Sequence, residues 1–246
     1  MSDVESTSRL DAFAEAMASV LQKCVWSQTM THETLVPYLI EETYELVDAI
    51  EAGTTEEIIE ELGDVLWQVA FHSEIASRTS SDPDGAGHFD IQDVAQRVTE
   101  KMVRRHPHVF GDEVAETPED VLRLWNAAKA AEKRQRTSVL EGIPQGMPAL
   151  ALADKVIGRA QRVGVVVDTL DDPMGDAGQD AVPFDDEEGL GELLLDIVAT
   201  AKARGLDAER ALRVTVRALQ GEIRAAEALE SSAPRPGEPP ASASSA

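Results

Sequence analysis

Residues 39–69 read LIEETYELVDAIEAGTTEEIIEELGDVLWQV, two helical patterns joined at a single glycine. Before Gly53, the apolar residues Leu39, Leu46 and Ile50 recur with the spacing of one helix face. The same spacing continues after the glycine in Ile58, Leu62, Val65, Leu66 and Val69. The stretch therefore predicts two helices, the first over about 33–52 and the second from 54 to about 77.

The turn between these two helices has residues suited to it. Gly53 is a residue type that commonly follows a helix C-terminus. Thr54 and Glu57 have the spacing of a capping box, in which each side chain accepts a hydrogen bond from the backbone N–H of the other residue. Because the connection is so short, we expect the two helices to form an antiparallel hairpin.

Helical periodicity continues on both sides of the hairpin, and aromatic residues make up only 4% of the chain. These features predict an all-α protein built as a helical bundle, with further helices over about 8–22, 90–105 and 117–135. Asp90 can cap the second of these, and the His106-Pro107 step ends it because a residue that precedes proline disfavours helical backbone. The face expected to point inward carries Ile91, Val94, Val98 and Met102.

Composition divides the chain into four parts. Residues 1–136 are predicted to form one helical domain, which a Gly- and Pro-containing linker over 137–148 separates from a second helical region, 149–230. Residues 231–246 are rich in Ser, Pro and Ala, offer little to bury, and are predicted to be a disordered tail.

The second region is predicted to contain two helical stretches, over about 149–163 and 192–229. Between them lies a strongly acidic insert, 168–188, that contains no Lys or Arg and is predicted to be a loop.

Charge narrows the classes of partner. With 22 Lys and Arg against 46 Asp and Glu, the formal charge is −24 at pH 7, which opposes binding to nucleic acids and anionic membranes. The sequence contains no long apolar run and no secretory signal pattern. The single Cys24 cannot form an internal disulfide. Together these features predict a soluble, cytoplasmic protein with no membrane partner.

The hairpin concentrates acidic side chains in two motifs, Glu41-Glu42-x-x-Glu45 and Glu61-x-x-Asp64. Helical spacing puts Glu42 and Glu45 on one stripe, and Glu61 and Asp64 on the matching stripe of the second helix. No Lys or Arg lies between residues 38 and 74 to neutralise them. Mg²⁺ prefers such oxygen ligands and is commonly held by carboxylates together with substrate phosphates. The alternative is that these acids are solvated faces of two acidic helices.

Basic residues gather in one stretch of this acidic chain: Lys101, Arg104, Arg105, Arg123, Lys129, Lys133, Arg134 and Arg136. Trp125, Lys129 and Lys133 share a helical stripe, as do Lys101 and Arg105. Such a face could stack a base and hold phosphates. A tryptophan at the edge of the core with solvated lysines explains the pattern equally well. A carboxylate-held Mg²⁺ beside this face would suit the metal-assisted hydrolysis of a nucleotide polyphosphate.

Four segments occur in order within about residues 10–136: CVWSQTMTHETLVPYLIEETYELVDAIEAG, EELGDVLWQVAFHSEIA, FDIQDVAQRVTEKMVRRHPHVFGD and WNAAKAAEK. Together they resemble the MazG family of nucleoside triphosphate pyrophosphohydrolases. The resemblance implies an all-α, usually dimeric enzyme that uses Mg²⁺, for which Mn²⁺ can substitute, to cleave nucleoside triphosphates to the monophosphate and pyrophosphate. Its role would be to clear altered or surplus nucleotides from the pool.

The resemblance also implies roles for individual residues. Glu42, Glu45, Glu61 and Asp64 would be the metal ligands, and Glu41 would assist them or serve as a base. Lys101 and Arg105 would hold the phosphates, and Trp125 and Lys129 would contact the nucleoside. Arg104 and Lys133 would also belong to the substrate-binding residues.

The second region resembles the second unit of two-domain members, but its acidic motifs are incomplete. No Glu-Glu-x-x-Glu lies between residues 164 and 189, and the second motif reads Gly189-Leu190-Gly191-Glu192. This predicts a degenerate repeat without catalytic function, used for packing or dimer contacts. A helical regulatory protein that binds nucleotide without turnover remains the alternative, and the intact motifs of the first region argue against it.

Overall fold

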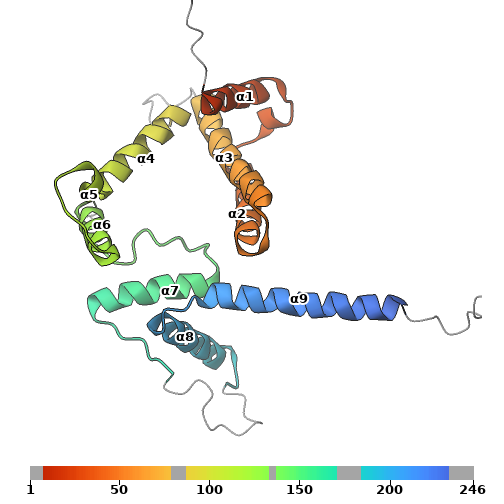
Figure 1. Cartoon of the computed structure of the whole chain (residues 1–246), viewed down its shortest axis with the longest axis vertical. Coiled ribbons are helices and arrows are strands. Elements are labelled where there is room, and N and C mark those ends of the chain that lie inside the picture. The colour runs from red at the N-terminus through yellow and green to blue at the C-terminus, as the bar shows by residue number, and fades with distance from the viewer. Residues whose placement is uncertain (1–7, 79–86, 133–136, 171–183, 233–246) are drawn as a thin grey trace, which may run out of the picture. The chain divides into compact units, whose positions relative to one another are not determined.

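The structure, a computed structural model, describes residues 8–78, 87–132, 137–170 and 184–232. All regular secondary structure in these residues is helical, which confirms the all-α prediction (Figure 1). No helix in the described part of the chain has the length and apolar character needed to span a membrane. The chain divides into two compact units, Met1–Lys133 and Arg134–Ala246.

The first unit begins with α1 (Arg9–Lys23), the 3-10 turn η1 (Ser27–Thr29), α2 (His32–Ala52) and α3 (Thr55–Arg78). Both α2 and α3 match the helices expected from the pattern to within one or two residues. The core lies where α1 crosses the N-terminal end of α2 and the C-terminal half of α3. Its buried residues are Met17, Leu21, Leu35, Ala70 and Phe71.

The α2–α3 turn has the predicted capping box. The Thr54 backbone N–H donates to Glu57 Oε2 over 2.6 Å, and the Glu57 N–H donates to Thr54 Oγ1 over 3.3 Å. Gly53 is the C-cap of α2 in an extended conformation, with φ −94° and ψ −171°. Glycine is needed there because a Cβ would lie 2.8 Å from the carbonyl oxygen of Ala49. Close approach, and not left-handed backbone, accounts for this glycine.

The apolar stripes of the hairpin are covered only in part. Leu39 and Leu46 are half-buried, but Ile50 is 61% exposed and Leu62 is 52% exposed. The prediction that the whole stripe is core is therefore wrong for a single chain. The reason is that the described core of this unit forms at the α1 end of the hairpin and leaves the turn end uncovered.

The first unit continues with α4 (Ile91–Arg105), the short α5 (Pro107–Phe110) and α6 (Pro118–Glu132). Asp90 caps α4 as predicted, accepting hydrogen bonds from the backbone N–H groups of Gln92 and Asp93. The helix ends before Pro107 as expected. Residues 133–136, which the pattern placed partly in the last of these helices, lie outside the described residues.

The inward face expected of α4 is only half present. Ile91 and Val94 are half-buried, whereas Val98 is 43% exposed and Met102 is 51% exposed. Ile91, at the start of α4, lines a cavity with residues of α1 and α3, whereas Val98 and Met102 lie farther along the helix, so that part of the prediction is wrong for the single chain.

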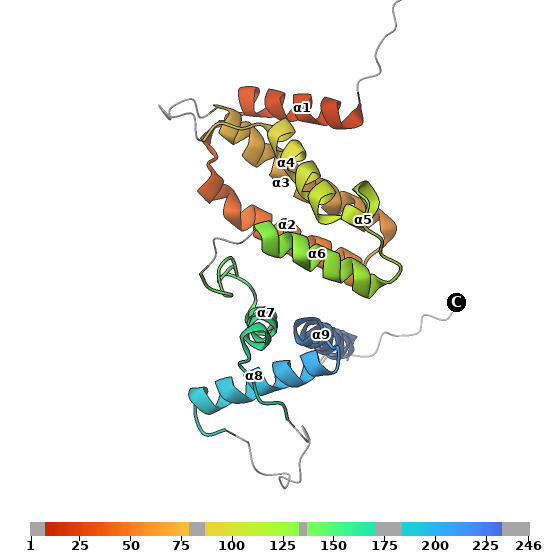
Figure 2. The ribbon, with the colours of Figure 1, turned by 90° about the vertical axis from the view of Figure 1, so that its left-hand side faces the viewer.

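The second unit contains α7 (Ala149–Ala160), η2 (Gln161–Val163), α8 (Glu187–Ala203) and α9 (Ala208–Ser232). Figure 2 shows α8 lying across α7 and α9, which are seen nearly end-on. Ile157 of α7 and Val198 and Ala199 of α8 form its buried cluster. Lys202 donates to both carboxylate oxygens of Asp154 over 2.9 Å and links α8 to α7.

Two sequence predictions for this unit need correction. The stretch over 192–229 is not one helix, because Gly205 takes a left-handed φ of 70° and ends α8, and Asp207 caps α9 by accepting from the Arg210 N–H. The acidic loop ends earlier than expected, since Asp186 caps α8 and Glu187 and Glu188 form its first turn. Residues 171–183 of that loop, and the tail from 233 on, lie outside the described residues.

Candidate metal centre

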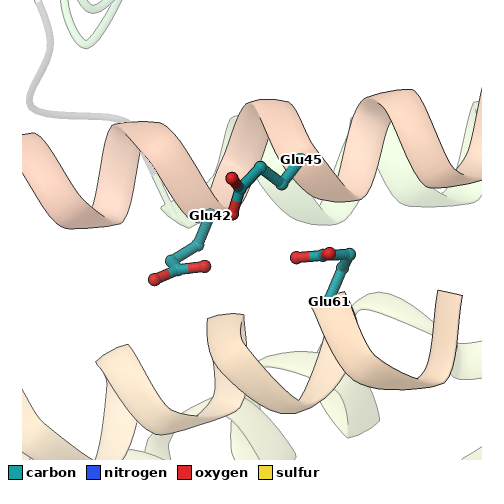
Figure 3. Close-up of side chains that lie close together, drawn as sticks. All are labelled: Glu42, Glu45 and Glu61. Atoms are coloured by element: carbon teal, nitrogen blue, oxygen red, sulfur yellow. The ribbon is translucent and has the colours of Figure 1, made fainter. Parts of the chain in front are cut away.

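Three carboxylates meet between α2 and α3. Glu42 and Glu45 lie three residues apart on α2, and Glu61 faces them from α3. One oxygen from each side chain lies within 4.8 Å of the others. Figure 3 shows the three side chains in the space between the two helices. The antiparallel hairpin therefore brings together acids that are up to nineteen residues apart in the sequence.

The electrostatics of this group are unfavourable for three free carboxylates. The pKa of Glu42 is raised by burial first, and then by the charges of Asp64 and Glu45. Burial and the charges of Glu45 and Asp64 also raise the pKa of Glu61. Every charged neighbour that contributes to these two shifts is another acid. The group holds concentrated negative charge that a cation would relieve.

One oxygen of the group has no partner. Glu61 Oε2 is buried and makes no hydrogen bond. A buried polar atom that lacks a partner costs free energy, so most such atoms in folded proteins are satisfied. This oxygen points to a ligand at the group, and a divalent cation is the ligand that carboxylate oxygens suit.

The remaining two predicted acids lie at the edge of the group. Asp64 is half-buried one turn after Glu61, outside the three-residue cluster, but its charge raises the pKa of both Glu42 and Glu61. Glu41 is exposed, and its charge also raises the pKa of Glu42. The structure thus gathers three of the four predicted ligands and places the fourth beside them.

A groove of about 300 Å³ runs from this group to the turn of the hairpin. Its lining residues come from both helices: Glu45, Asp48, Ala49, Ala52, Gly53, Glu57 and Glu61. Small side chains on α2 keep it open beside the carboxylates. The donor set and the open side together fit an oxygen-preferring divalent cation that keeps room for water or a further ligand.

The predicted basic face forms around a carboxylate. Glu132, at the end of α6, accepts hydrogen bonds from two arginines of α4: Arg104 Nε at 2.8 Å, and Arg105 through Nε at 3.2 Å and through Nη2. Hydrogen bonds from Arg105 and then Arg104 lower the pKa of Glu132 to about 2. The same contact with Glu132 raises the pKa of Arg105. Neither arginine is simply an exposed cation.

Trp125 has neighbours of its own. The Arg105 guanidinium carbon lies 5.1 Å from the centre of the Trp125 ring, a cation–π contact. The His106 ring meets the same indole edge-on, with centroids 5.1 Å apart. Part of the surface that the sequence assigns to a nucleoside base is therefore occupied by side chains of this chain.

The lysines have different surroundings. Lys101 is exposed on α4, while Lys129 is half-buried on α6. Lys133 lies outside the described residues. No Lys or Arg contributes to the pKa shifts of Glu42 or Glu61, so in the part of the chain described here the basic face stays separate from the acidic group.

Glu132 is a residue that the sequence analysis did not predict to be part of the basic face. It lies seven residues after Trp125, two helical turns along the same face, which is the signal that could have pointed to it. Among 46 acidic residues that spacing is not distinctive. Its two partners lie 27 and 28 residues away, so the pairing depends on how α4 and α6 pack.

Comparison with known proteins identifies relatives of this chain. The model of the MazG nucleotide pyrophosphohydrolase domain matches residues 30–110, which include α2, α3, α4 and α5. An uncharacterized 26.1 kDa protein in the blaB 3' region of Streptomyces cacaoi is 47% identical, over 89% of this chain and 83% of that protein.

Two relatives have named activities. The nucleoside triphosphate pyrophosphohydrolase/pyrophosphatase MazG of Thermotoga maritima is 36% identical, over 82% of this chain and 81% of its own length. The nucleoside triphosphate pyrophosphohydrolase of Escherichia coli K12 is also 36% identical, over 77% of this chain and 75% of its own.

Fold and site together define an all-α protein whose helical hairpin presents a carboxylate group suited to a divalent cation. The chain belongs to the MazG family of nucleotide pyrophosphohydrolases, hydrolases that act on phosphoric anhydrides.

Proposed function

We propose that this protein hydrolyses nucleoside triphosphates to the monophosphate and pyrophosphate in a reaction that requires Mg²⁺, with Mn²⁺ as a substitute. The observation that carries the proposal is the convergence of Glu42, Glu45 and Glu61 within 4.8 Å, with Glu61 Oε2 lacking a partner. The two relatives named as nucleoside triphosphate pyrophosphohydrolases support the choice of substrate. The biological role would be to remove altered or surplus nucleotides from the cytoplasmic pool.

Glu42, Glu45 and Glu61 would hold the cation, with Asp64 beside them. When bound, the cation supplies neutralisation of phosphate charge and makes water a better nucleophile. The water oxygen would bond to the α-phosphorus while the bond from that phosphorus to the pyrophosphate oxygen breaks. Glu41, exposed next to the group, would take the proton that the water loses.

The basic face would serve the phosphates and nucleoside. Lys101 is exposed and one helical turn before Arg105, so both could follow one polyphosphate chain. Trp125 and Lys129 would contact the nucleoside, with Arg104 and Lys133 at the margin. Within one chain these residues lie apart from the acidic group. A complete site therefore needs the basic residues of another chain to lie next to the acidic group.

A second copy of the chain would complete the site, and we propose a homodimer. The support is the amount of apolar surface left open on the first unit, since contiguous exposed apolar surface on a folded protein marks interaction sites. The exposed residues on α2, α3 and α4 include Tyr44, Ile50, Ile59, Leu62, Leu66, Val98 and Met102. Residues 1–136 would be the catalytic domain, and residues 149–230 a degenerate repeat that serves packing or dimer contacts.

Product analysis with a panel of nucleoside triphosphates, with and without Mg²⁺, tests the proposal. Wild type should release pyrophosphate and monophosphate only with the metal, and Glu45→Ala should abolish the reaction. Glu192→Ala, an exposed acid at the matching motif of α8, is the control and should leave the rate unchanged. Nucleotide binding by wild type without any turnover would mean that the protein is a sensor and not an enzyme.

A further inference from the structure

Glu132 makes the most extensive side-chain ion pair in the first unit among the described residues. Its Oε1 accepts from Arg104 Nε and Arg105 Nε, and its Oε2 accepts from Arg105 Nε and Nη2. The side chains of Arg105 and Glu132 are only 12% and 18% exposed. The pair is therefore a specific, partly desolvated contact and not a transient surface one.

The edge of Arg105 that Glu132 occupies matters for phosphate binding. Arginine recognises carboxylates and phosphates in the same way, by donating two parallel N–H groups to two oxygens. Arg105 uses its Nε and Nη2 edge on Glu132, while one face of the guanidinium lies over Trp125. In this state a phosphate cannot use that edge unless the carboxylate leaves it.

Protonation does not release the carboxylate. Because the pKa of Glu132 is lowered to about 2, the group stays ionised at any pH at which the protein would work. A competing anion that pairs with Arg105 is a way to free it at such pH. A polyphosphate carries several charges and can reach the exposed Lys101 one turn away as well.

We propose that Glu132 is an internal competitor for phosphate, which occupies the phosphate-binding edge of Arg105 until a polyphosphate displaces it. Every ligand that uses this edge loses affinity by the same factor. A ligand whose binding depends on this contact alone, such as a single phosphate group, is then held too weakly to occupy the site. A triphosphate, with further contacts, still binds. The inference rests on the proposed function insofar as Arg105 is a phosphate ligand.

Binding of inorganic tripolyphosphate, measured by calorimetry at fixed salt in metal-free buffer, tests this directly. Glu132→Gln and Glu132→Ala should bind it about tenfold more tightly than wild type, the order expected when a charge-assisted hydrogen bond no longer has to be broken. Glu119→Gln removes an exposed acid from the first turn of the same helix, so it controls for net charge and should stay within about twofold of wild type.

A double substitution locates the effect. If the tighter binding of tripolyphosphate comes from freeing Arg105, then the double variant Arg105→Gln/Glu132→Gln should no longer bind it more tightly than wild type. In turnover, Glu132→Gln should lower KM for the triphosphate with kcat little changed, which loss of a merely structural contact would not do. Helical circular dichroism checks that each variant is folded.

The proposal is overturned if both Glu132 variants bind tripolyphosphate no better than Glu119→Gln. It is equally overturned if neither variant folds, because the pair would then be a fixed anchor that no ligand displaces. The binding assay requires no hydrolysis. If the wild type hydrolyses no nucleoside triphosphate, the proposed function is wrong, but the tripolyphosphate affinities of the variants still test the competitor proposal. If the Glu132 variants hydrolyse nucleoside triphosphates normally but bind tripolyphosphate no more tightly than wild type, only the competitor proposal is wrong.

Discussion

Helix α3 carries Glu61-Leu62-Gly63-Asp64, and α8 in the second unit carries Gly189-Leu190-Gly191-Glu192, the segment that we propose corresponds to it. In α3 the first acid meets two carboxylates from α2 and forms a group with raised pKa values. In α8 the first residue of this segment is a glycine. The helix is held instead by apolar contacts to α7 and by the Lys202–Asp154 pair.

The comparison teaches that packing and chemistry have separate requirements. An apolar stripe is enough to keep α8 in place, because burial does not depend on direction. The carboxylate group of the first unit needs acids on two helices that face each other, which is a requirement of direction that an apolar stripe does not have. Among its described residues, the second unit has an apolar cluster and the acid Glu192 but no group of converging carboxylates.

Glu61→Gln should have the largest effect. It removes one ligand charge from the group while keeping the shape of the side chain, and kcat/KM for a nucleoside triphosphate should fall about a thousandfold. Steady-state pyrophosphate release measures this. Glu192→Gln in α8 is the matched change and should leave kcat/KM unaltered. A comparable loss in both variants would mean that the second unit carries chemistry after all.

Two glycine substitutions should shift stability in opposite directions. Gly53→Ala would put a Cβ 2.8 Å from the backbone of Ala49 and should destabilise the fold by about 1–3 kcal/mol. Gly189→Ala meets only ordinary contacts at 3.4 Å inside a helix, and should stabilise it by about 0.4–1 kcal/mol. Chemical denaturation compares the two. A stable Gly53→Ala variant would show that the hairpin turn tolerates displacement.

The pH dependence of Tm, measured with a chelator present to remove metal ions, should show the effect of the raised pKa values in the acidic group. Because the folded-state pKa values of Glu42 and Glu61 are raised, protonation of these groups favours the folded state. That stability is fully present below the ordinary pKa of 4.5 and is lost as pH rises through the raised values. The Tm of wild type should therefore fall relative to Glu61→Gln as pH increases from about 4.5. A Tm difference between wild type and Glu61→Gln that does not change with pH would contradict the raised pKa values.

Lys202→Met should have the smallest effect. Lys202 and Asp154 are 27% and 49% exposed, and pairs this open contribute less than about 1 kcal/mol. Denaturation should show a change within that range, and hydrolysis by the first unit should be unaltered. A large loss of stability would mean that the ion pair, and not the apolar cluster, holds α8 on α7.

Local sequence patterns were sufficient for the helices of the first unit and for much of the site. The capping residues Thr54, Glu57 and Asp90 and the His106-Pro107 step specify helix ends through contacts within a few residues, which is why they could be read directly. The spacing of Glu42, Glu45 and Glu61 predicted their convergence for the same reason, since only a short hairpin separates them.

Other features depend on packing between distant segments. The break between α8 and α9 is an exception, because Gly205 and Asp207 mark it locally, but apolar spacing alone does not register such a break. It also could not show which apolar residues a neighbour covers, and Ile50, Leu62 and Met102 are exposed in the single chain.

The pairing of Glu132 with Arg104 and Arg105 is the clearest case of this second kind. The residues are 27 and 28 positions apart, on helices whose separate patterns say nothing about their mutual register. Helical periodicity specifies the face on which a side chain lies, because it follows from backbone geometry within a few turns. The partner that the side chain meets follows from the packing of whole helices, and only their arrangement in space assigned Glu132 to the two arginines.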